Sequence, residues 1–252
     1  MLVLQTKNLM SSKNSKSLNF IKKYPFFKKI YFFYNIYIRN YKFYFNGSQF
    51  GEDKDILNIF KNKYNGNYLD LGCFHPTRSN NTSKLFKRGW KGINIDLNPL
   101  TIELFDYARP KDINICAAIS NKEEKKKLYF LGDLDSKNTL NLNHKKWLNR
   151  HFGIKNKDFK IKNIKTKKLN NILKKHNFYN IDFMNIDIEG HELEVIETID
   201  FKKFKISVIC IEILDYDIFA VNRKKRLISF LKKKGFKLIT RNKINYIFKK
   251  TH

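Results

Sequence analysis

The sequence predicts an α/β domain built on a mostly parallel sheet with helices on both faces. Short apolar runs that end in an acid alternate with helical stretches, as a strand–helix–strand repeat requires. The runs at 68–71 and 91–95 lead into Gly72 and Asp96, with room for one helix between them. Parallel strands joined by a crossover helix end at one edge of the sheet, where open α/β sheets bind ligands.

Each further element follows from a local pattern. Apolar spacing along 53–63 predicts a helix that ends before the turn at 65–67. The later elements are expected, in chain order, as helix 82–88, strand 91–96, helix 99–107, strand 112–120, strand 127–131, strand 159–166, helix 168–176, strand 181–188, helix 192–199, strand 208–213, helix 224–234, and strands 236–240 and 246–250. Gly235 would end the last helix, and Asn242-Lys243 would make the turn of a closing hairpin.

The length and composition fit one domain with an appended segment. The chain has 252 residues, of which 42% are hydrophobic, enough for a sizeable core. We divide it into an N-terminal extension at 1–47 and a domain at 48–252. A net charge of +28 would ordinarily indicate an anionic partner. The chain is also rich in Asn, Ile, Phe and Tyr, as expected of an A/T-biased genome, so local charge is more informative than the total.

The N-terminal extension is basic and aromatic. Residues 1–50 hold nine cations and no acid, and 20–45 interleaves those cations with aromatic rings. Such a segment suits the surface of an anionic membrane, or an amphipathic helix folded onto the domain itself. Single-stranded nucleic acid is a third and less favoured partner. The apolar runs are too short to span a bilayer, and the polar start at 1–16 does not resemble a secretory signal.

The glycine pattern after the first strand narrows the choice of ligand. A dinucleotide fold needs GxGxxG, whereas here Gly72 is followed by bulky residues at 74–76. An adenosyl ligand without phosphates remains compatible with this loop. Asp96, 24 positions after Gly72, could accept hydrogen bonds from both ribose hydroxyls, or it could cap the helix that begins near Pro99.

Three acids and an imidazole gather after two later strands. They are Asp187, Glu189, His191 and Glu212. Asp187 or His191 could serve as a general base, with Glu189 and Glu212 orienting the acceptor or the base. A divalent cation on Asp187, Glu189 and Glu212 is a second interpretation. We do not favour the metal, because side chains that alternate along a strand end do not converge on one point.

Several blocks of the sequence resemble one protein family. They are 48–53 (SQFGED), 68–76 (YLDLGCFHP), 79–82 (SNNT), 89–96 (GWKGINID) and 187–192 (DIEGHE). From about Ser48 to its C-terminus the chain resembles the FkbM family of S-adenosylmethionine-dependent methyltransferases. The resemblance implies a Rossmann-like class I methyltransferase sheet, with strand order 3-2-1-4-5-7-6 and one antiparallel strand. The His75-Pro76 pair departs from the second glycine that many members carry.

The resemblance also implies S-adenosyl-L-methionine as the cofactor and O-methylation of a sugar, glycan or small metabolite. The implied cofactor-binding residues are Asp70, Gly72, Cys73, His75, Ser79, Asn80, Asp96, Asn98 and Ala118. Backbone donors at the start of helix 82–88 would face the methionine carboxylate of the cofactor, and Ala118 would lie against its adenine.

The acceptor side is less sharply indicated. Gln49 and Asp53 are candidate substrate contacts, although Asp53 could equally cap its helix. The polar insert at 132–158 is either a substrate-covering lid or a solvated loop with one surface helix. An RNA methyltransferase is an alternative, although no N-P-P-Y-type motif follows strand 181–188. A membrane-associated binding protein without catalysis is another.

Three cysteines bear on the compartment of the protein. Their number is odd and no CxxC spacing occurs, which favours a reducing compartment. We therefore expect a cytoplasmic protein, in solution or at the inner face of a membrane. Cys116 and Cys210 lie in apolar stretches and are expected in the core.

Overall fold

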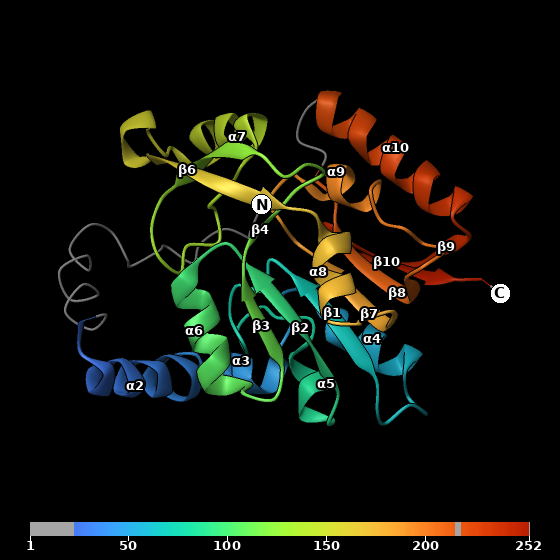
Figure 1. The fold of residues 1–252 in the computed structure, drawn as a ribbon, viewed down its shortest axis with the longest axis horizontal. Coiled ribbons are helices and arrows are strands. Elements are labelled where there is room, and N and C mark those ends of the chain that lie inside the picture. Colours follow the sequence, from blue (N-terminus) through green and yellow to red (C-terminus); the bar gives the residue numbers. More distant parts are fainter. Residues whose placement is uncertain (1–22, 215–217, 252) are drawn as a thin grey trace.

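The structure is a computed structural model that describes residues 23–214 and 218–251. The polar start at 1–16 and the first residues of the aromatic segment, 20–22, lie outside the described residues. The elements are α2 (Pro25–Phe33), η2 (Tyr34–Arg39), α3 (Tyr41–Asn46), α4 (Glu52–Ile59), β1 (Asn67–Leu71), α5 (Ser83–Lys87), β2 (Lys91–Asp96), α6 (Pro99–Ala108), β3 (Ile113–Cys116), β4 (Ala118–Ile119), β5 (Lys125–Phe130), α7 (Leu142–Phe152), η3 (Asn156–Asp158), β6 (Lys160–Lys167), α8 (Leu169–Lys175), β7 (Asn180–Ile186), α9 (Glu192–Ile196), β8 (Lys205–Glu212), α10 (Ile218–Lys233), β9 (Phe236–Asn242) and β10 (Asn245–Lys250). Figure 1 shows these elements arranged around one large sheet.

The large sheet confirms the predicted topology. Its seven strands follow the order β3-β2-β1-β7-β8-β10-β9. β1 pairs in parallel with β2 and β7, while β10 runs antiparallel to both β8 and β9. Numbered along the sheet alone, this order is 3-2-1-4-5-7-6. The carboxyl ends of β1, β2, β7 and β8 therefore meet at one edge, as the strand–helix repeat predicted.

Alternating side chains along the central strands build a separate core on each face of the sheet. Tyr68 of β1 packs with α4 and α5, whereas its neighbour Leu69 packs with α8, α9 and α10. On β8, Cys210 and Ile211 divide between the two cores in the same way. Because both faces are covered, these strands are buried along most of their length. The residues at the carboxyl ends of these strands are less deeply buried, and they lie at the edge of the sheet.

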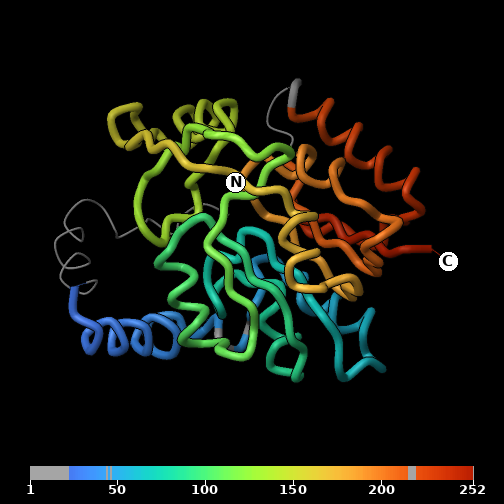
Figure 2. The backbone as a smooth tube through the Cα atoms, viewed as in Figure 1, coloured from blue at the N-terminus to red at the C-terminus, as the bar shows by residue number. Residues whose placement is uncertain are grey.

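The predicted strand 112–120 is wrong as one strand, since it is divided between two sheets. β3 pairs with β2 at the edge of the large sheet, and β4 pairs with β6 in a three-stranded sheet of order β4-β6-β5. In Figure 2 this small sheet and α7 lie together over one end of the large sheet. Cys116 is consequently exposed, because it ends an edge strand. The expectation that it packs in the core is wrong, whereas Cys210 is buried as expected.

The described part of the predicted extension is helical and packs on the domain. α2 and the π-helix η2 pack on α6, where Phe32 and Ile36 contact Leu100 and Leu104, and α3 continues the segment from η2. Lys28 Nζ adds an ion pair of 2.8 Å with Glu103 on α6. Among residues 23–214 and 218–251, no helix combines the length and the apolar content that crossing a membrane requires.

Candidate active site

β1 and β7 end side by side, and the residues that follow them touch. The backbone N–H of Asp187 donates to Leu71 O at 2.9 Å, and Gly72 has a left-handed φ of 75°. A Cβ atom on Gly72 would lie 1.7 Å from Asp187 O, so a side chain has no space there. The glycine is therefore required by the meeting of the two strand ends themselves. It brings the loop after β1 into contact with the acidic loop after β7.

Asp70 lies at the centre of a buried polar network. Its Oδ2 accepts hydrogen bonds from Asn80 Nδ2 and Thr82 Oγ1, and its Oδ1 accepts one from Asn185 Nδ2, at 2.9 to 3.0 Å. Arg109, only 1% exposed, donates to Thr82 Oγ1 and to Asn80 Oδ1. Burial raises the pKa of Asp70, although the Asn185 hydrogen bond and the charge of Arg109 oppose that rise. Both carboxylate oxygens of Asp70 are engaged with protein donors.

His75 has a similar internal role in the loop after β1. Its Nδ1 accepts hydrogen bonds from the backbone N–H of Thr77 and of Arg78, at 3.1 and 2.9 Å. Its Nε2 lies 3.3 Å from Asn35 Oδ1 on η2. Burial lowers the pKa of His75 well below its usual range, which keeps the ring neutral. Ser79 in the same loop has a φ of 49°, so this short loop reverses sharply before α5.

Asp96 and Asn98 form the end of β2. Asp96 accepts hydrogen bonds from the backbone N–H of Phe74 at 3.1 Å and of Asn98 at 2.8 Å. Burial raises the pKa of Asp96 to about 6. Asn98 Oδ1 caps α6 by accepting from Leu100 N, while the buried Asn98 Nδ2 has no hydrogen-bond partner among the described residues. Each carboxylate oxygen of Asp96 can accept a further bond, so this edge offers both an acceptor and a donor to a ligand.

Cys73 and Ala118 border the same edge. The Cys73 side chain is buried, and its N–H donates to Ile95 O at 3.3 Å. Asp96 O accepts a hydrogen bond of 2.9 Å from Ala117 N, which places Ala118 directly beyond the end of β2. Ala118 adds only a methyl group at that point.

Asp187 and Glu212 form a pair of acids at the ends of β7 and β8. Burial and the charge of neighbouring acids raise the pKa of both carboxyl groups well above their usual values, and the two interact directly. Glu212 Oε2 is buried, and the described residues supply no donor to it. Two carboxyl groups this close do not both ionise readily, so the pair retains a proton more strongly than either acid would alone.

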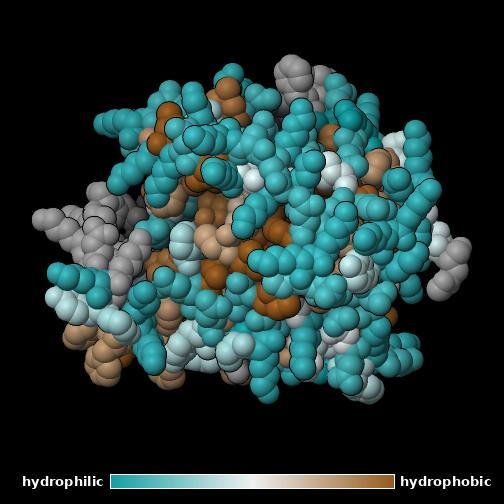
Figure 3. All heavy atoms as spheres, viewed as in Figure 1, coloured by the Kyte–Doolittle hydropathy of each residue, from teal (hydrophilic) through white to brown (hydrophobic). Residues whose placement is uncertain are grey.

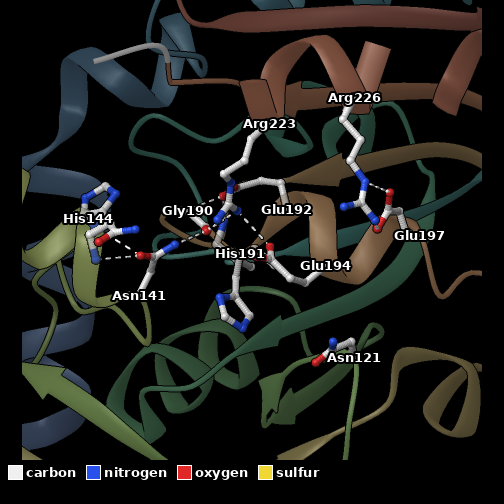
Figure 4. Close-up of polar contacts among 12 residues, drawn as sticks. Asn121, Asn141, His144, Gly190, His191, Glu192, Glu194, Glu197, Arg223 and Arg226 are labelled. Atoms are coloured by element: carbon white, nitrogen blue, oxygen red, sulfur yellow. Dashed lines mark hydrogen bonds and ion pairs between the residues drawn. The ribbon is translucent and has the colours of Figure 1, made fainter. Parts of the chain in front are cut away.

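The turn after Asp187 is held by elements from two sides, as Figure 4 shows. Glu189 and Gly190 both have a left-handed φ, of 56° and 91°. Thr139 Oγ1 donates to Glu189 O at 2.8 Å, and Asn141 Nδ2 donates to Gly190 O at 2.5 Å. Arg223 of α10 donates to the same Gly190 oxygen at 2.6 Å. The insert at 132–158 thus packs onto the acidic loop, and the single helix expected in one of its two interpretations is present as α7.

The side chains of Glu189 and Glu192 face protein groups. Glu189 Oε2 lies 3.0 Å from Nε2 of His144, a residue of the insert that is 1% exposed. Glu192 Oε1 accepts hydrogen bonds from the backbone N–H of Ile188 and of Gly190. Glu192 therefore stabilises the turn that presents Asp187.

His191 faces away from the pair of acids. Its Nε2 lies 3.1 Å from Lys126 Nζ and 3.4 Å from Ser120 Oγ, near the small sheet. Burial lowers the pKa of His191 to about 4, so the ring is neutral at pH 7. Figure 4 shows the ring pointing away from the Gly190–Arg223 contact.

The two candidate substrate contacts differ in exposure. Gln49 is exposed, whereas Asp53 is 1% exposed and accepts a hydrogen bond of 2.7 Å from Ser48 Oγ. Asp53 Oδ2 also lies 2.5 Å from Lys84 Nζ of α5. Asp53 thus ties α4 to α5.

The structure brings Gly72, Asp96, Asp187 and Glu212 to one edge of the sheet. Thr82 and His144 lie in the block 79–82 and the insert 132–158 that the sequence indicated, and both support this edge. Sequence reasoning missed the other supporting residues: they are Arg109, Thr139, Asn141, Asn185 and Arg223. A polar residue inside the apolar strand 181–186 was a signal for Asn185, whereas nothing in the sequence around Arg109 indicates its buried partners. In the described part of the chain, no three His, Cys, Asp or Glu side chains are placed to hold a metal ion.

Comparison with known proteins agrees with this geometry. The model of the FkbM methyltransferase domain matches residues 59–238, which include every strand of the large sheet up to the start of β9. No curated protein sequence matches the chain significantly. The match covers more than half of the chain and contains Gly72, Asp96 and the acidic pair. The chain therefore belongs to the FkbM family, and it is an S-adenosylmethionine-dependent methyltransferase.

Proposed function

We propose that this methyltransferase methylates a hydroxyl oxygen of a sugar, a glycan or a small metabolite. The observation that best supports the proposal is the acid pair of Asp187 and Glu212, which lies in contact with the Gly72 loop. A hydroxyl oxygen attacks effectively only when its proton can leave. A carboxylate whose pKa is raised accepts that proton more readily than an ordinary one.

Asp187 is the base in this proposal. Two adjacent carboxylates repel each other, so the pair of Asp187 and Glu212 keeps a proton more readily than a single exposed acid does. The ionised carboxylate takes the proton of the acceptor hydroxyl, while the protonated partner keeps the site from accumulating a second charge. His191 is a poorer candidate, because its low pKa makes it a weak base and its Nε2 faces Lys126.

The cofactor would be held at the ends of β1 and β2. Asp96 has free acceptor capacity for the ribose hydroxyls, and Asn98 Nδ2 is a buried donor without a partner among the described residues. We assign the small Ala118 to the adenine side of the cofactor. When bound, S-adenosylmethionine supplies a methyl group already activated on its sulfonium. The protein therefore needs mainly to orient the acceptor and to accept its proton.

Asp70, His75 and Asn80 act as positioning residues in this proposal, because their polar side-chain atoms already contact the chain. Cys73 and Ser79 contribute through the shape of the backbone in the same loop. Gln49 remains a candidate contact for the acceptor, whereas Asp53 is engaged by Lys84. All three cysteines are free thiols, which fits our proposal that the enzyme works in a reducing compartment such as the cytoplasm.

The test is methyl transfer from labelled S-adenosylmethionine to a panel of acceptors. The panel holds free sugars, nucleotide sugars, glycolipids and hydroxy acids, with RNA for comparison. We expect label on a hydroxyl compound, and a rate about 10² to 10⁴ times lower for Asp187→Asn, as for loss of a general base. Cofactor affinity, measured by calorimetry, should change little, because Asp187 faces the acceptor side.

A matched control is Asp106→Asn, an exposed acid on α6, which should keep the wild-type rate. Label that appears only on RNA would contradict the proposed acceptor class. A rate for Asp187→Asn close to that of the wild type would remove Asp187 from the role of base.

A further inference from the structure

The N-terminal helices carry a continuous apolar surface that faces solvent. Its side chains are Phe26, Ile30, Phe33, Tyr34, Ile38 and Tyr41, which we name the aromatic face. All are at least 47% exposed, and Phe26 reaches 70%. Spacings of three and four residues place them on one side of the segment formed by α2, η2 and the start of α3. Figure 3 shows brown and tan spheres gathered at the lower left, where α2 lies in Figure 1.

The opposite side of the same segment anchors it to the domain. Phe32 is 3% exposed and Ile36 is 1% exposed, and both pack against α6. Asn35 and Asn40 are also buried, and Asn40 Nδ2 donates to Asn35 Oδ1 at 2.8 Å. The segment thus has two apolar sides. One side packs on the domain, and the other, the aromatic face, is exposed to solvent. Apolar patches of this kind on a folded surface mark interaction sites.

Cations lie on the same segment. Lys23, Lys29 and Lys42 are exposed, and no Asp or Glu occurs between residues 23 and 51. Lysine stems can lie along apolar surface while their ammonium groups reach outward to anions. Two copies of this face would bring these like charges together, so self-association is disfavoured. Rings with adjacent cations match a surface that has apolar depth below a layer of negative charge.

We infer that the aromatic face binds the surface of an anionic lipid bilayer. The rings enter the boundary between headgroups and acyl chains, and the lysines contact the lipid phosphates. The helices lie on the bilayer and do not cross it, in agreement with their short length. The inference is independent of the identity of the methyl acceptor.

The segment is also in contact with the cofactor side of the molecule. Asn35 on η2 lies 3.3 Å from His75, whose ring organises the loop after β1. The side of the segment opposite the aromatic face thus contacts the loop that begins at Gly72, so lipid binding would orient this loop relative to the bilayer.

The experiment measures binding of the full-length protein to vesicles by flotation. The vesicles contain equal parts of phosphatidylcholine and phosphatidylglycerol, or phosphatidylcholine alone. The test variant is Ile30→Ser, Phe33→Ser and Ile38→Ser together, and the matched control is Tyr64→Ser, Ile161→Ser and Ile239→Ser, three exposed apolar residues elsewhere. Because the whole chain is cationic, the comparison between these two variants is the decisive one.

We expect the test variant to bind anionic vesicles at least about tenfold more weakly, and the control to bind within about twofold of the wild type. The variant Lys23→Gln, Lys29→Gln and Lys42→Gln should also lose about tenfold or more, whereas Lys202→Gln, Lys205→Gln and Lys249→Gln should lose less. Neutral vesicles should bind the wild type weakly.

Equal vesicle binding by the test variant and its control would overturn the inference, because general positive charge would then explain binding. Equally strong binding to neutral vesicles would overturn it as well. Light scattering separates a second copy of the chain as the occupant: that outcome would be a wild-type dimer that the test variant converts to a monomer, with vesicle binding unchanged.

Discussion

Asp70 and Asp187 belong to neighbouring paired strands, and their surroundings are opposite. Asp70 is fully buried and receives three side-chain hydrogen bonds, so its charge is compensated inside the protein. Asp187 is half-buried: burial and then the charges of Glu189 and Glu192 raise its pKa, and its hydrogen bond with Glu212 opposes that rise only in part. Both carboxyl groups have a raised pKa, but for Asp70 burial alone is responsible.

The comparison shows that burial of an acid does not by itself indicate catalysis. A carboxylate whose oxygens both accept hydrogen bonds from the protein holds parts of the fold together and is little available to a substrate. We call such a residue a structural joint. A carboxylate placed among like charges raises the free energy of the folded state, and such an arrangement is typical of a functional site. The two kinds of acid meet at Gly72, which lies between them in space.

The largest effect is expected where these two regions join. Gly72→Ala should reduce the free energy of unfolding by about 3 to 5 kcal/mol or more, because its Cβ would overlap the Asp187 carbonyl and φ is left-handed. Urea unfolding measures this loss. Gly132→Ala is the matched control, since nothing lies within 4 Å of the added Cβ. Equal stability of the two variants would mean that β1 and β7 do not meet as described.

Replacing the compensated acid should have the next largest effect. In Asp70→Asn the new amide nitrogen would face the donors of Asn80, Thr82 or Asn185, at a cost of about 2 to 4 kcal/mol of stability. Thermal or urea unfolding would detect it. Asp106→Asn, which replaces an exposed acid, should change stability by less than about 0.5 kcal/mol. If both variants unfold alike, Asp70 is not a structural joint.

Asp96 accepts hydrogen bonds from the backbone, as Asp70 does from side chains, and keeps capacity for a ligand. Its role should therefore appear in the pH dependence of cofactor affinity. With a pKa of about 6, it is ionised at pH 7 and protonated at pH 5, and the ionised form accepts hydrogen bonds from the ribose. Affinity for S-adenosylmethionine should therefore fall as the pH falls, by about tenfold between pH 7 and pH 5. Calorimetry at several pH values measures this change. Asp96→Asn should bind more weakly and show a flat profile; a flat profile in the wild type would contradict the role of Asp96.

The smallest expected effect is that of Asp187→Asn, which should stabilise the folded protein, whereas Gly72→Ala and Asp70→Asn should destabilise it. The pKa of Asp187 is raised on folding, so the folded state binds more protons than the unfolded state and loses stability as the pH rises. Asp187→Asn removes this opposed charge and should stabilise the protein by about 1 kcal/mol at pH 7. The gain should shrink as the pH falls to the ordinary pKa of an aspartate and vanish below about pH 3, where Asp187 is protonated in both states. Destabilisation at pH 7 would place Asp187 in the same class as Asp70.

The large sheet could be predicted from the sequence because its signals are local. The alternating run at 91–96 predicted β2 to the residue, and the buried run at 181–188 predicted β7 to within two residues. The prediction failed at 112–120, because β4 leaves the large sheet to pair with β6, a partner about fifty positions away. No local pattern records where one strand ends and another sheet begins.

The sequence predicted where the candidate site lies, but it did not predict the role of each acid in that site. Acids at strand ends must meet at one edge, so Asp96, Asp187 and Glu212 could be grouped from the sequence. Their hydrogen-bond partners could not, because a carboxylate flanked by donors and one flanked by acids look alike in a sequence. Arg109 illustrates the point: it is buried against Thr82 and Asn80, although its neighbours in the chain are ordinary.

The Gly190 carbonyl oxygen accepts hydrogen bonds from two distant parts of the chain, which limits how the insert at 132–158 can be exchanged. Asn141 of the insert and Arg223 of α10 both donate to it, although they are far apart along the chain. Removing the insert would therefore also remove one of the two side-chain hydrogen bonds that hold the Gly190 carbonyl in the turn after Asp187. Exchanging segment 132–158 between related enzymes would therefore also change how the turn that follows Asp187 is held.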